Sequence, residues 1–172
     1  GGVRGAEAGA INLLVGGDER DLERARAGLA PWCSAIHHLG PLGAGQVAKT
    51  VNNLIHWAQI AAIREALSLA AAYGLSVPDV RAALEAGPTD SRTLRELELM
   101  RLTWHVKDLA NAQKMAAEVD MVLPIAEASR LAMLDTSVDE LHRLLTTTGA
   151  SEPRTSHSAT GGTGAGAPRP NR

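Results

Sequence analysis

The amino-acid sequence predicts a mainly α-helical fold that is preceded by a short strand–helix–strand segment. Alanine and leucine dominate the 172 residues, phenylalanine is absent, and aromatic residues make up only 2%. This composition favours helices over strands. Apolar residues recur at intervals of three and four over much of residues 43–148, which is the period of a helix. With 45% hydrophobic residues, the chain can bury a sizeable aliphatic core.

Residues 1–42 differ in pattern from the rest. Two short apolar runs, AINLLVGG and SAIHHLG, flank the charged stretch DERDLERARAGLA. Asp18 is positioned to cap a helix there, and Asp21 lies near the positive end of that helix. The order strand, helix, strand is typical of a βαβ unit. Because two strands do not form a sheet that is stable alone, we expect residues 1–42 to be the end of a larger α/β domain.

The longest predicted helix runs from about Gln46 to Tyr73, and Gly74 is its stop signal. Its apolar residues occupy nearly all faces, which is typical of a helix that is buried on all sides. At about 1.5 Å per residue it would be roughly 40 Å long. We therefore expect other helices, or a second subunit, to surround it.

Shorter helices are predicted further along the chain. Ser76 and Pro78 mark one start, Pro124 marks another, and Ser137 with Glu140 forms a capping-box pattern. The last stretch, 149–172, contains mainly glycine, serine, threonine, proline and arginine, and it is predicted to be disordered. The expected helices cover residues 76–87, 90–100, 104–119, 124–135 and 137–145.

Composition argues against several classes of partner. The formal net charge is -2 and the pI about 6.3, which does not indicate a nucleic acid or a membrane surface as partner. No apolar run reaches the roughly 18 residues of a membrane span. The single Cys33 excludes an internal disulfide and suits a reducing cytoplasm. Because the chain begins with Gly-Gly and not with Met, we expect its start not to be a natural translation start.

A polar group opens the longest helix. In GAGQVAKTVNN, Lys49 and Asn53 are four residues apart and share one helix face, while Asn52 lies on a neighbouring face. A lysine beside an apolar surface is partly desolvated and can serve as a general acid or base. An amide one turn later can hold a hydroxyl or a carboxylate. Alternatively, Lys49 extends from the helix end into solvent and the asparagines are capping or solvated residues.

Two further motifs allow two interpretations each. The glycines of GAG could bring backbone N–H groups close to an anion, or they could form a tight strand-to-helix turn. Lys107 and Asp108 in KDLANA could be functional, or they could be a solvated pair on an exposed face. The adjacent His37 and His38 would point to opposite faces of a strand. We therefore predict no metal site.

Three motifs, in order and spacing, resemble the β-hydroxyacid dehydrogenase family, the family of 3-hydroxyisobutyrate dehydrogenase and tartronate semialdehyde reductase. GAGQVAKTVNN resembles the family's catalytic motif, GGVRGAEAGA resembles the end of its substrate loop, and KDLANA resembles its second lysine motif. The resemblance covers Gly1 to about Leu145. It implies an all-helical C-terminal domain of the 6-phosphogluconate dehydrogenase type over 43–148, preceded by a strand–helix–strand remnant of a Rossmann domain over 1–42.

The resemblance also implies roles for individual residues. Lys49 would be the catalytic lysine, Asn53 would hold the substrate, and the backbone of Gly1 and Gly2 would bind its carboxylate. Lys107 would approach the cofactor, with Asp108 orienting it. The cofactor, NAD or NADP, would be bound mainly by a domain that is absent from this chain. The long helix would form a homodimer or tetramer.

This sequence departs from the family pattern at several positions. The family's serine before Gly-Gly is missing, and Met100 stands where a phenylalanine is common. Asn52 replaces the histidine of 6-phosphogluconate dehydrogenases, which favours small hydroxyacids over a sugar phosphate. Lys49 argues against imine reductases, which usually lose this lysine.

The resulting functional hypothesis is the C-terminal part of a cytoplasmic NAD(P)-dependent oxidoreductase. It would interconvert a small β-hydroxyacid and its semialdehyde, and we expect the chain alone to be inactive without the N-terminal domain. The alternative is a non-catalytic helical module that dimerises or binds a partner.

Overall fold

The computed structural model describes residues 2–149. Gly1 and almost all of the predicted disordered tail lie outside the described residues. The fold is mainly helical with a two-stranded sheet, which confirms the predicted fold class. The elements in order are α1 (Gly2–Glu7), β1 (Ile11–Val15), α2 (Glu19–Leu29), the 3-10 helix η1 (Ala30–Trp32), β2 (Cys33–His38), α3 (Ala44–Ala72), α4 (Val77–Glu85), α5 (Arg92–Arg95), the 3-10 helix η2 (Leu97–Leu99), α6 (His105–Ala117), α7 (Pro124–Leu134) and α8 (Val138–Leu145).

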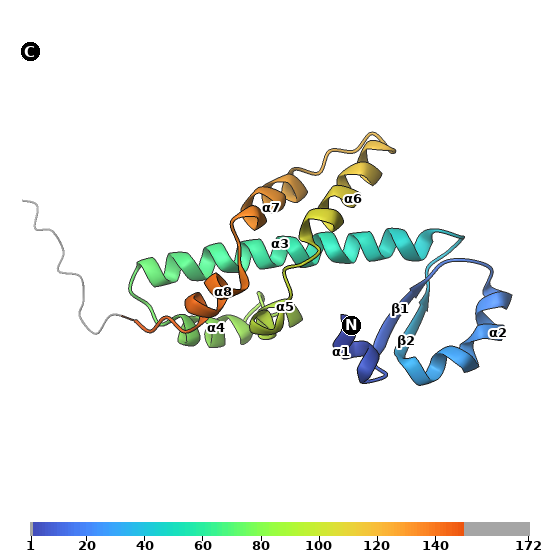
Figure 1. The fold of residues 1–172 in the computed structure, drawn as a ribbon, viewed down its shortest axis with the longest axis horizontal. Coiled ribbons are helices and arrows are strands. Elements are labelled where there is room, and N and C mark those ends of the chain that lie inside the picture. Colours follow the sequence, from blue (N-terminus) through green and yellow to red (C-terminus); the bar gives the residue numbers. More distant parts are fainter. Residues whose placement is uncertain (1, 150–172) are drawn as a thin grey trace, which may run out of the picture.

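The strand–helix–strand segment forms as predicted. Strands β1 and β2 pair in parallel, from Ile11 opposite Cys33 to Val15 opposite His38, with α2 as the crossover helix. The Asp18 carboxylate caps α2 by accepting a hydrogen bond of 2.8 Å from the backbone N–H of Arg20. This small unit lies at the N-terminal end of α3 (Figure 1).

The short helix α1 was not predicted, because the glycine-rich sequence before β1 lacks a helical apolar pattern. It packs against β1, and Arg4 forms an ion pair of 3.3 Å with Glu96 in the helical part. The predicted helix over 90–100 is divided into α5 and η2, because Glu96 leaves the helical conformation. Both Leu94 and Leu97 are buried as a result.

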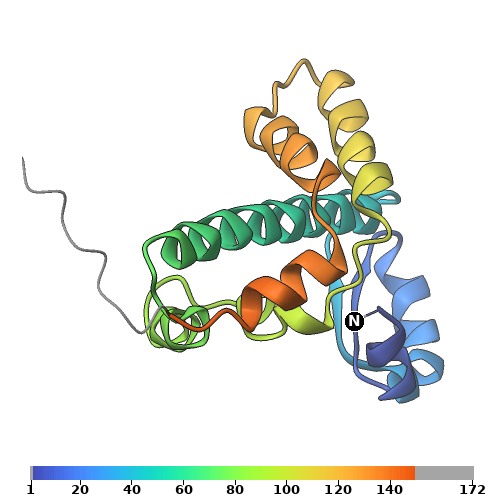
Figure 2. The same cartoon turned by 60° about the vertical axis from the view of Figure 1, so that its left-hand side comes forward.

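Helix α3 is the scaffold of the helical part. It contacts β1 and the five helices α4 to α8. Figures 1 and 2 show α6 and α7 on one side of α3, with α4, α5 and α8 on the other. The middle of α3 is buried and its ends are not: the side chains of Val47, Val51, Ile55 and Leu69 are each 49–61% exposed. The shorter helices thus cover α3 only in part. The core cluster comprises Trp57, Ile60, Ala61, Leu67, Val77, Leu97, Leu109, Met133 and Leu141.

Polar contacts fix the C-terminal helix against α3. The Ser137 hydroxyl accepts a hydrogen bond from the backbone N–H of Glu140, as the capping-box pattern predicts. The Glu140 carboxylate does not return to the cap and instead pairs with Arg64 of α3 at 2.8 Å. After α8, the Thr147 carbonyl oxygen accepts a hydrogen bond from the Val77 N–H, and Gly149 packs against the Gly74 carbonyl. The described chain therefore ends beside the C-terminal end of α3.

No helix within residues 2–149 is both long enough and apolar enough to cross a membrane.

Two glycines allow α3 to begin directly beside the sheet. Gly43, the residue before the helix, has a φ of 96°, which glycine adopts at little cost. At Gly45, a β-carbon would collide with the Leu14 carbonyl oxygen and would lie 3.1 Å from the backbone nitrogen of Gly16. Of the two interpretations of GAG, the geometry supports the tight strand-to-helix turn.

We predict that Gly45→Ala lowers the free energy of unfolding by about 1–3 kcal/mol, because the added methyl group overpacks the contact between α3 and β1. Urea denaturation measures the change. Gly28→Ala in α2 is the matched control, since its β-carbon would meet no atom within 4 Å. There the same substitution should stabilise the chain by up to about 1 kcal/mol. Equal effects at both positions would contradict the role of close approach.

Candidate functional site

One stripe of polar side chains follows the first turns of α3. Gln46, Lys49, Thr50 and Asn53 recur at intervals of three and four, so they lie on one face of the helix. The Thr50 hydroxyl donates a hydrogen bond of 3.0 Å to the Gln46 carbonyl oxygen. This polar stripe lies at the N-terminal end of a helix that is rich in apolar residues.

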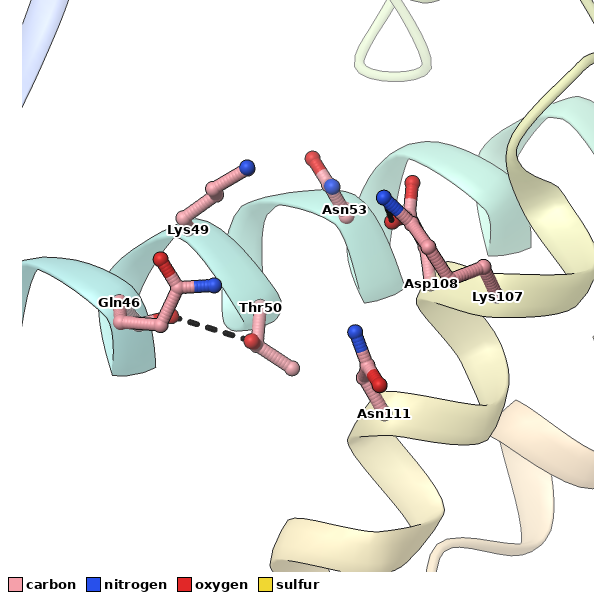
Figure 3. A pocket seen from close by; sticks show the side chains of 7 residues that line it. All are labelled: Gln46, Lys49, Thr50, Asn53, Lys107, Asp108 and Asn111. Carbon is pink, nitrogen blue, oxygen red and sulfur yellow. Dashed lines mark hydrogen bonds and ion pairs between the residues drawn. The ribbon is translucent and has the colours of Figure 1, made fainter.

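Helix α6 brings a second polar group to the same place. Lys107, Asp108 and Asn111 line one pocket together with the four residues of the α3 stripe (Figure 3). We call this the α3–α6 pocket. It combines two lysines with one carboxylate, and every residue that lines it is polar. Such a pocket suits a small anionic ligand that carries hydrogen-bonding groups.

Asp108 is the buried anchor of the pocket. Its side chain is 11% exposed, and it accepts a hydrogen bond of 3.2 Å from the indole N–H of Trp57, which is 4% exposed. Its other oxygen lies 3.7 Å from the Lys107 ammonium. A carboxylate in the first turn of a helix is also stabilised by the helix dipole. The interpretation as a solvated pair is therefore wrong for Asp108, although it describes Lys107, whose side chain is 58% exposed.

A second contact restrains Lys107. Its ammonium lies 4.9 Å from the centroid of the Trp104 ring, within the range of a cation–π interaction. The lysine is thus held between an aromatic face and a carboxylate. This pairing limits the positions that the ammonium adopts at the edge of the pocket.

The structure bears on the two interpretations of Lys49. Its side chain is exposed, as in the interpretation in which it extends from the helix end into solvent, whereas the other interpretation expected partial desolvation by apolar neighbours. Among the residues that the structure describes, it forms no ion pair or side-chain hydrogen bond. Half-buried Asn53 accepts a hydrogen bond of 3.2 Å from the Asn52 amide, which leaves the Asn53 NH₂ group free to donate. Lys49 and Asn53 therefore offer unused donors on one face of α3.

Two histidine rings lie beside Trp57, the partner of Asp108. The Trp57 ring is 5.0 Å from the His56 ring and 5.8 Å from the His105 ring. Nδ1 of His56 is hydrogen-bonded to the Thr93 hydroxyl at 3.1 Å. Burial lowers the pKa of His56, and the charge of Asp108 opposes this shift. His56 is not among the pocket residues, and it is connected to the pocket through Trp57, whose indole N–H donates to Asp108.

The remaining predicted positions lie elsewhere. Gly2 begins α1 and does not line the α3–α6 pocket, while Gly1 lies outside the described residues. His38 is hydrogen-bonded to the Gly17 carbonyl oxygen. No group of three His, Cys, Asp or Glu that could hold a metal ion occurs between residues 2 and 149.

Sequence reasoning missed three pocket residues: Gln46, Thr50 and Asn111. Asn111 follows Lys107 by four residues, so the helical period could have identified it. The helix face of Lys49 likewise includes Gln46 and Thr50.

Comparison with known proteins identifies the family of the chain. Residues 43–143 match a family model described as "NAD-binding of NADP-dependent 3-hydroxyisobutyrate dehydrogenase". The chain belongs to this family. The match covers α3 and α6, which carry the pocket, and it confirms the resemblance to the β-hydroxyacid dehydrogenases.

Individual relatives are consistent with the family. A "Probable 3-hydroxyisobutyrate dehydrogenase" of Mycobacterium tuberculosis is 50% identical over 76 residues, which are 44% of this chain and 26% of the relative. An "NAD-dependent L-serine dehydrogenase" of Pseudomonas aeruginosa is 44% identical over 75 residues, which are 44% of this chain and 25% of the relative. In these alignments the chain spans about a quarter of the length of its curated relatives.

A solved structure extends the similarity to the fold. The Mycobacterium tuberculosis 3-hydroxyisobutyrate dehydrogenase with L-serine matches this structure with a TM-score of 0.72 and 28% sequence identity. The match covers 84% of this chain and 58% of that chain. It therefore includes most of the described chain.

We predict that Trp57→Phe lowers the free energy of unfolding by about 1–3 kcal/mol, because it removes the N–H that satisfies the buried Asp108 carboxylate. Urea denaturation tests this, and a double-mutant cycle with Asp108→Ala isolates the hydrogen bond. Trp104→Phe is the matched control. That side chain is 59% exposed, so its loss should cost less than about 1 kcal/mol. The role of the hydrogen bond is refuted if Trp57→Phe costs as much in the Asp108→Ala variant as in the unmodified chain.

We also predict that acidification destabilises the fold through His56. Because its pKa is lowered in the folded chain, the unfolded chain binds more protons between the lowered pKa and the ordinary value of about 6.5. Stability is therefore lost as the pH falls through about 6.5, and the loss levels off below the folded-state pKa. Since water reaches part of the ring, the loss should stay below about 1 kcal/mol. Urea denaturation across this range should show a weaker pH dependence in His56→Gln.

Proposed function

We propose that this chain contributes the substrate-binding and proton-transferring part of an NAD(P)-dependent dehydrogenase that interconverts a small β-hydroxyacid and its semialdehyde. The observation that carries the proposal is the α3–α6 pocket, where Lys49 and the NH₂ group of Asn53, neither of which has a partner among residues 2–149, line one space with the restrained Lys107. Membership of the family supports it, as do the two relatives that are described as a 3-hydroxyisobutyrate dehydrogenase and an L-serine dehydrogenase. Residues 1–42 are assigned to a dinucleotide-binding domain and 43–148 to the helical domain.

In the proposed oxidation, Lys49 is the proton acceptor. The substrate hydroxyl loses its proton to the neutral Lys49 amine as the carbon-bound hydrogen leaves with its electron pair. The C–O single bond becomes the carbonyl of the semialdehyde, and Lys49 becomes an ammonium ion. A bound nicotinamide cofactor would accept this hydride, or supply it in the reverse reaction. In reduction, the Lys49 ammonium returns the proton to the carbonyl oxygen.

Asn53 is the orienting residue in this proposal. Its free NH₂ group can donate to the hydroxyl oxygen or to the carboxylate, one helical turn from Lys49. When Lys49 is protonated, as it is before it donates in reduction, two ammonium groups outweigh the single Asp108 carboxylate, which favours a carboxylate-bearing substrate. Binding of the substrate carboxylate by the backbone of Gly1 and Gly2 stays a prediction.

The donor set of the pocket also fits a nearby cofactor. Lys107 projects from α6 with its charge only partly balanced at 3.7 Å from Asp108, so it can contact an electron-rich group. These 172 residues contain no GxGxxG pattern, and Lys107 is the residue of this chain that we assign to the cofactor. Whether that cofactor is NAD or NADP depends on groups that recognise the ribose.

We predict that Lys49→Ala reduces hydride transfer by about 10²–10⁴-fold, the contribution of a positioned acid–base group. The assay uses a fusion in which this chain replaces the corresponding part of the Mycobacterium tuberculosis relative, with nicotinamide absorbance as the readout. Lys114→Ala is the matched control, because Lys114 is also exposed and does not line the pocket. Full activity of Lys49→Ala would exclude the catalytic role.

The alternative proposal is a non-catalytic module that associates through α3. It is supported by Val47, Val51 and Ile55, which recur every four residues and leave an apolar stripe about half exposed. The same stripe is compatible with a homodimer or tetramer of the enzyme. Sedimentation velocity measures whether the fusion forms oligomers. If it does, but no β-hydroxyacid supports hydride transfer, the non-catalytic module is the better explanation of the chain.

A further inference from the structure

Asn111 faces the α3–α6 pocket from α6. Figure 3 shows its amide directed toward α3, into the space between Thr50 and Asp108. It lies one turn beyond Lys107 on the same helix face. The residue is exposed and belongs to no core cluster, so a ligand in the pocket can reach its amide.

The neighbours of Asn111 already use much of their hydrogen-bonding capacity. The Thr50 hydroxyl donates to the Gln46 carbonyl oxygen, and Asp108 accepts from Trp57 and pairs with Lys107. Within residues 2–149, the Asn111 side chain forms no hydrogen bond. Its two N–H donors and its carbonyl oxygen are therefore available to a ligand.

Charge further restricts the ligand. Lys49 and Lys107 contribute two positive charges and Asp108 one negative charge, so the pocket carries a formal excess of one positive charge. The Asp108 carboxylate is already compensated by Lys107 and the Trp57 N–H. The pocket therefore favours an acidic ligand whose additional substituent carries oxygen over one whose additional substituent is an ammonium group.

We propose that Asn111 determines substrate specificity by hydrogen bonding to a hydroxyl or carboxylate on carbon 2 of the β-hydroxyacid. The site then prefers acids with an oxygen-bearing substituent at this carbon over acids with a methyl group. A methyl group would strip water from the amide without replacing its hydrogen bonds, and sites built for hydrogen bonding reject such analogues. This inference rests on the proposed function, because it concerns the substrate of the same pocket.

Three acids with a common 3-hydroxypropanoate frame test the inference. Glycerate, 3-hydroxyisobutyrate and L-serine differ only at carbon 2, which carries a hydroxyl, a methyl or an ammonium group. Each is titrated into the full 172-residue chain, and NMR follows the Asn111 side-chain amide. We expect glycerate to bind at least about tenfold more tightly than 3-hydroxyisobutyrate and more tightly than L-serine, and to shift the Asn111 NH₂ signals.

Variants connect the preference to this amide. Asn111→Leu should reduce the ratio of the glycerate and 3-hydroxyisobutyrate affinities to about one, since it replaces the polar group with an apolar one of similar size. Asn12→Leu, the same substitution at an exposed position of β1 outside the pocket, should leave the ratio unchanged. Because Asn111 is exposed, its variant should fold, and the NMR spectrum verifies this.

Three results would overturn the inference: equal affinities in the unmodified chain, a ratio that Asn111→Leu does not change, or no binding of any of the three acids. The hydride-transfer assay of Lys49→Ala decides the proposed function separately. If the fusion is active but its substrate preference does not depend on Asn111, the proposed dehydrogenase function stands and the proposed role of Asn111 in specificity is rejected.

Discussion

The burial of the middle of α3 by five shorter helices is the constraint on which the rest of the structure depends. Most of the helical core either lies on α3 or packs against it, including Trp57, Ile60 and Leu67. The same helix begins with the polar stripe of Lys49 and Asn53 and packs its first turn against β1. One continuous element therefore links the sheet, the pocket and the core. Shifts at Gly45 would be transmitted directly to the lysine one turn later.

The pocket needs two helices, and the Trp57–Asp108 hydrogen bond connects them. Trp57 belongs to the buried side of α3, whereas Asp108 belongs to the first turn of α6. The carboxylate is both an internal partner for the indole and the counter-charge for Lys107. Structural support and charge placement thus use the two oxygens of one carboxylate. A substitution at Asp108 would affect both properties together, which makes the two effects hard to separate by mutation of that residue alone.

The sequence predicted the long helix and most of its neighbours correctly because their apolar periodicity and stop signals are local. Asp18, Ser137 and Pro124 begin helices where the pattern indicates. The short α1 escaped prediction because its stability comes from contacts with β1 and Glu96, which no local pattern contains. The division of the 90–100 segment likewise follows from burying both Leu94 and Leu97.

For the pocket, sequence motifs identified the residues that the chemistry would use but not their environment. The positions of Lys49, Asn53 and Lys107 could be found in advance, and their functional roles stay predictions. The exposure of Lys49 and the burial of Asp108 could not be found, because both depend on how α6 crosses α3. The helical period could have identified Asn111 as a residue on the Lys107 face. Without the position of α3 relative to α6, however, Asn111 could not be distinguished from an ordinary surface amide.

The packing of Gly149 against Gly74 has a practical consequence for handling the molecule. Lys49 and Gly74 are 25 positions apart in numbering, which at the helical rise corresponds to roughly 37 Å. The described chain therefore ends at the far end of α3 from the pocket. A tether that holds the protein near Gly149, on a sensor chip or a bead, would attach it at the end of α3 that is distant from the α3–α6 pocket.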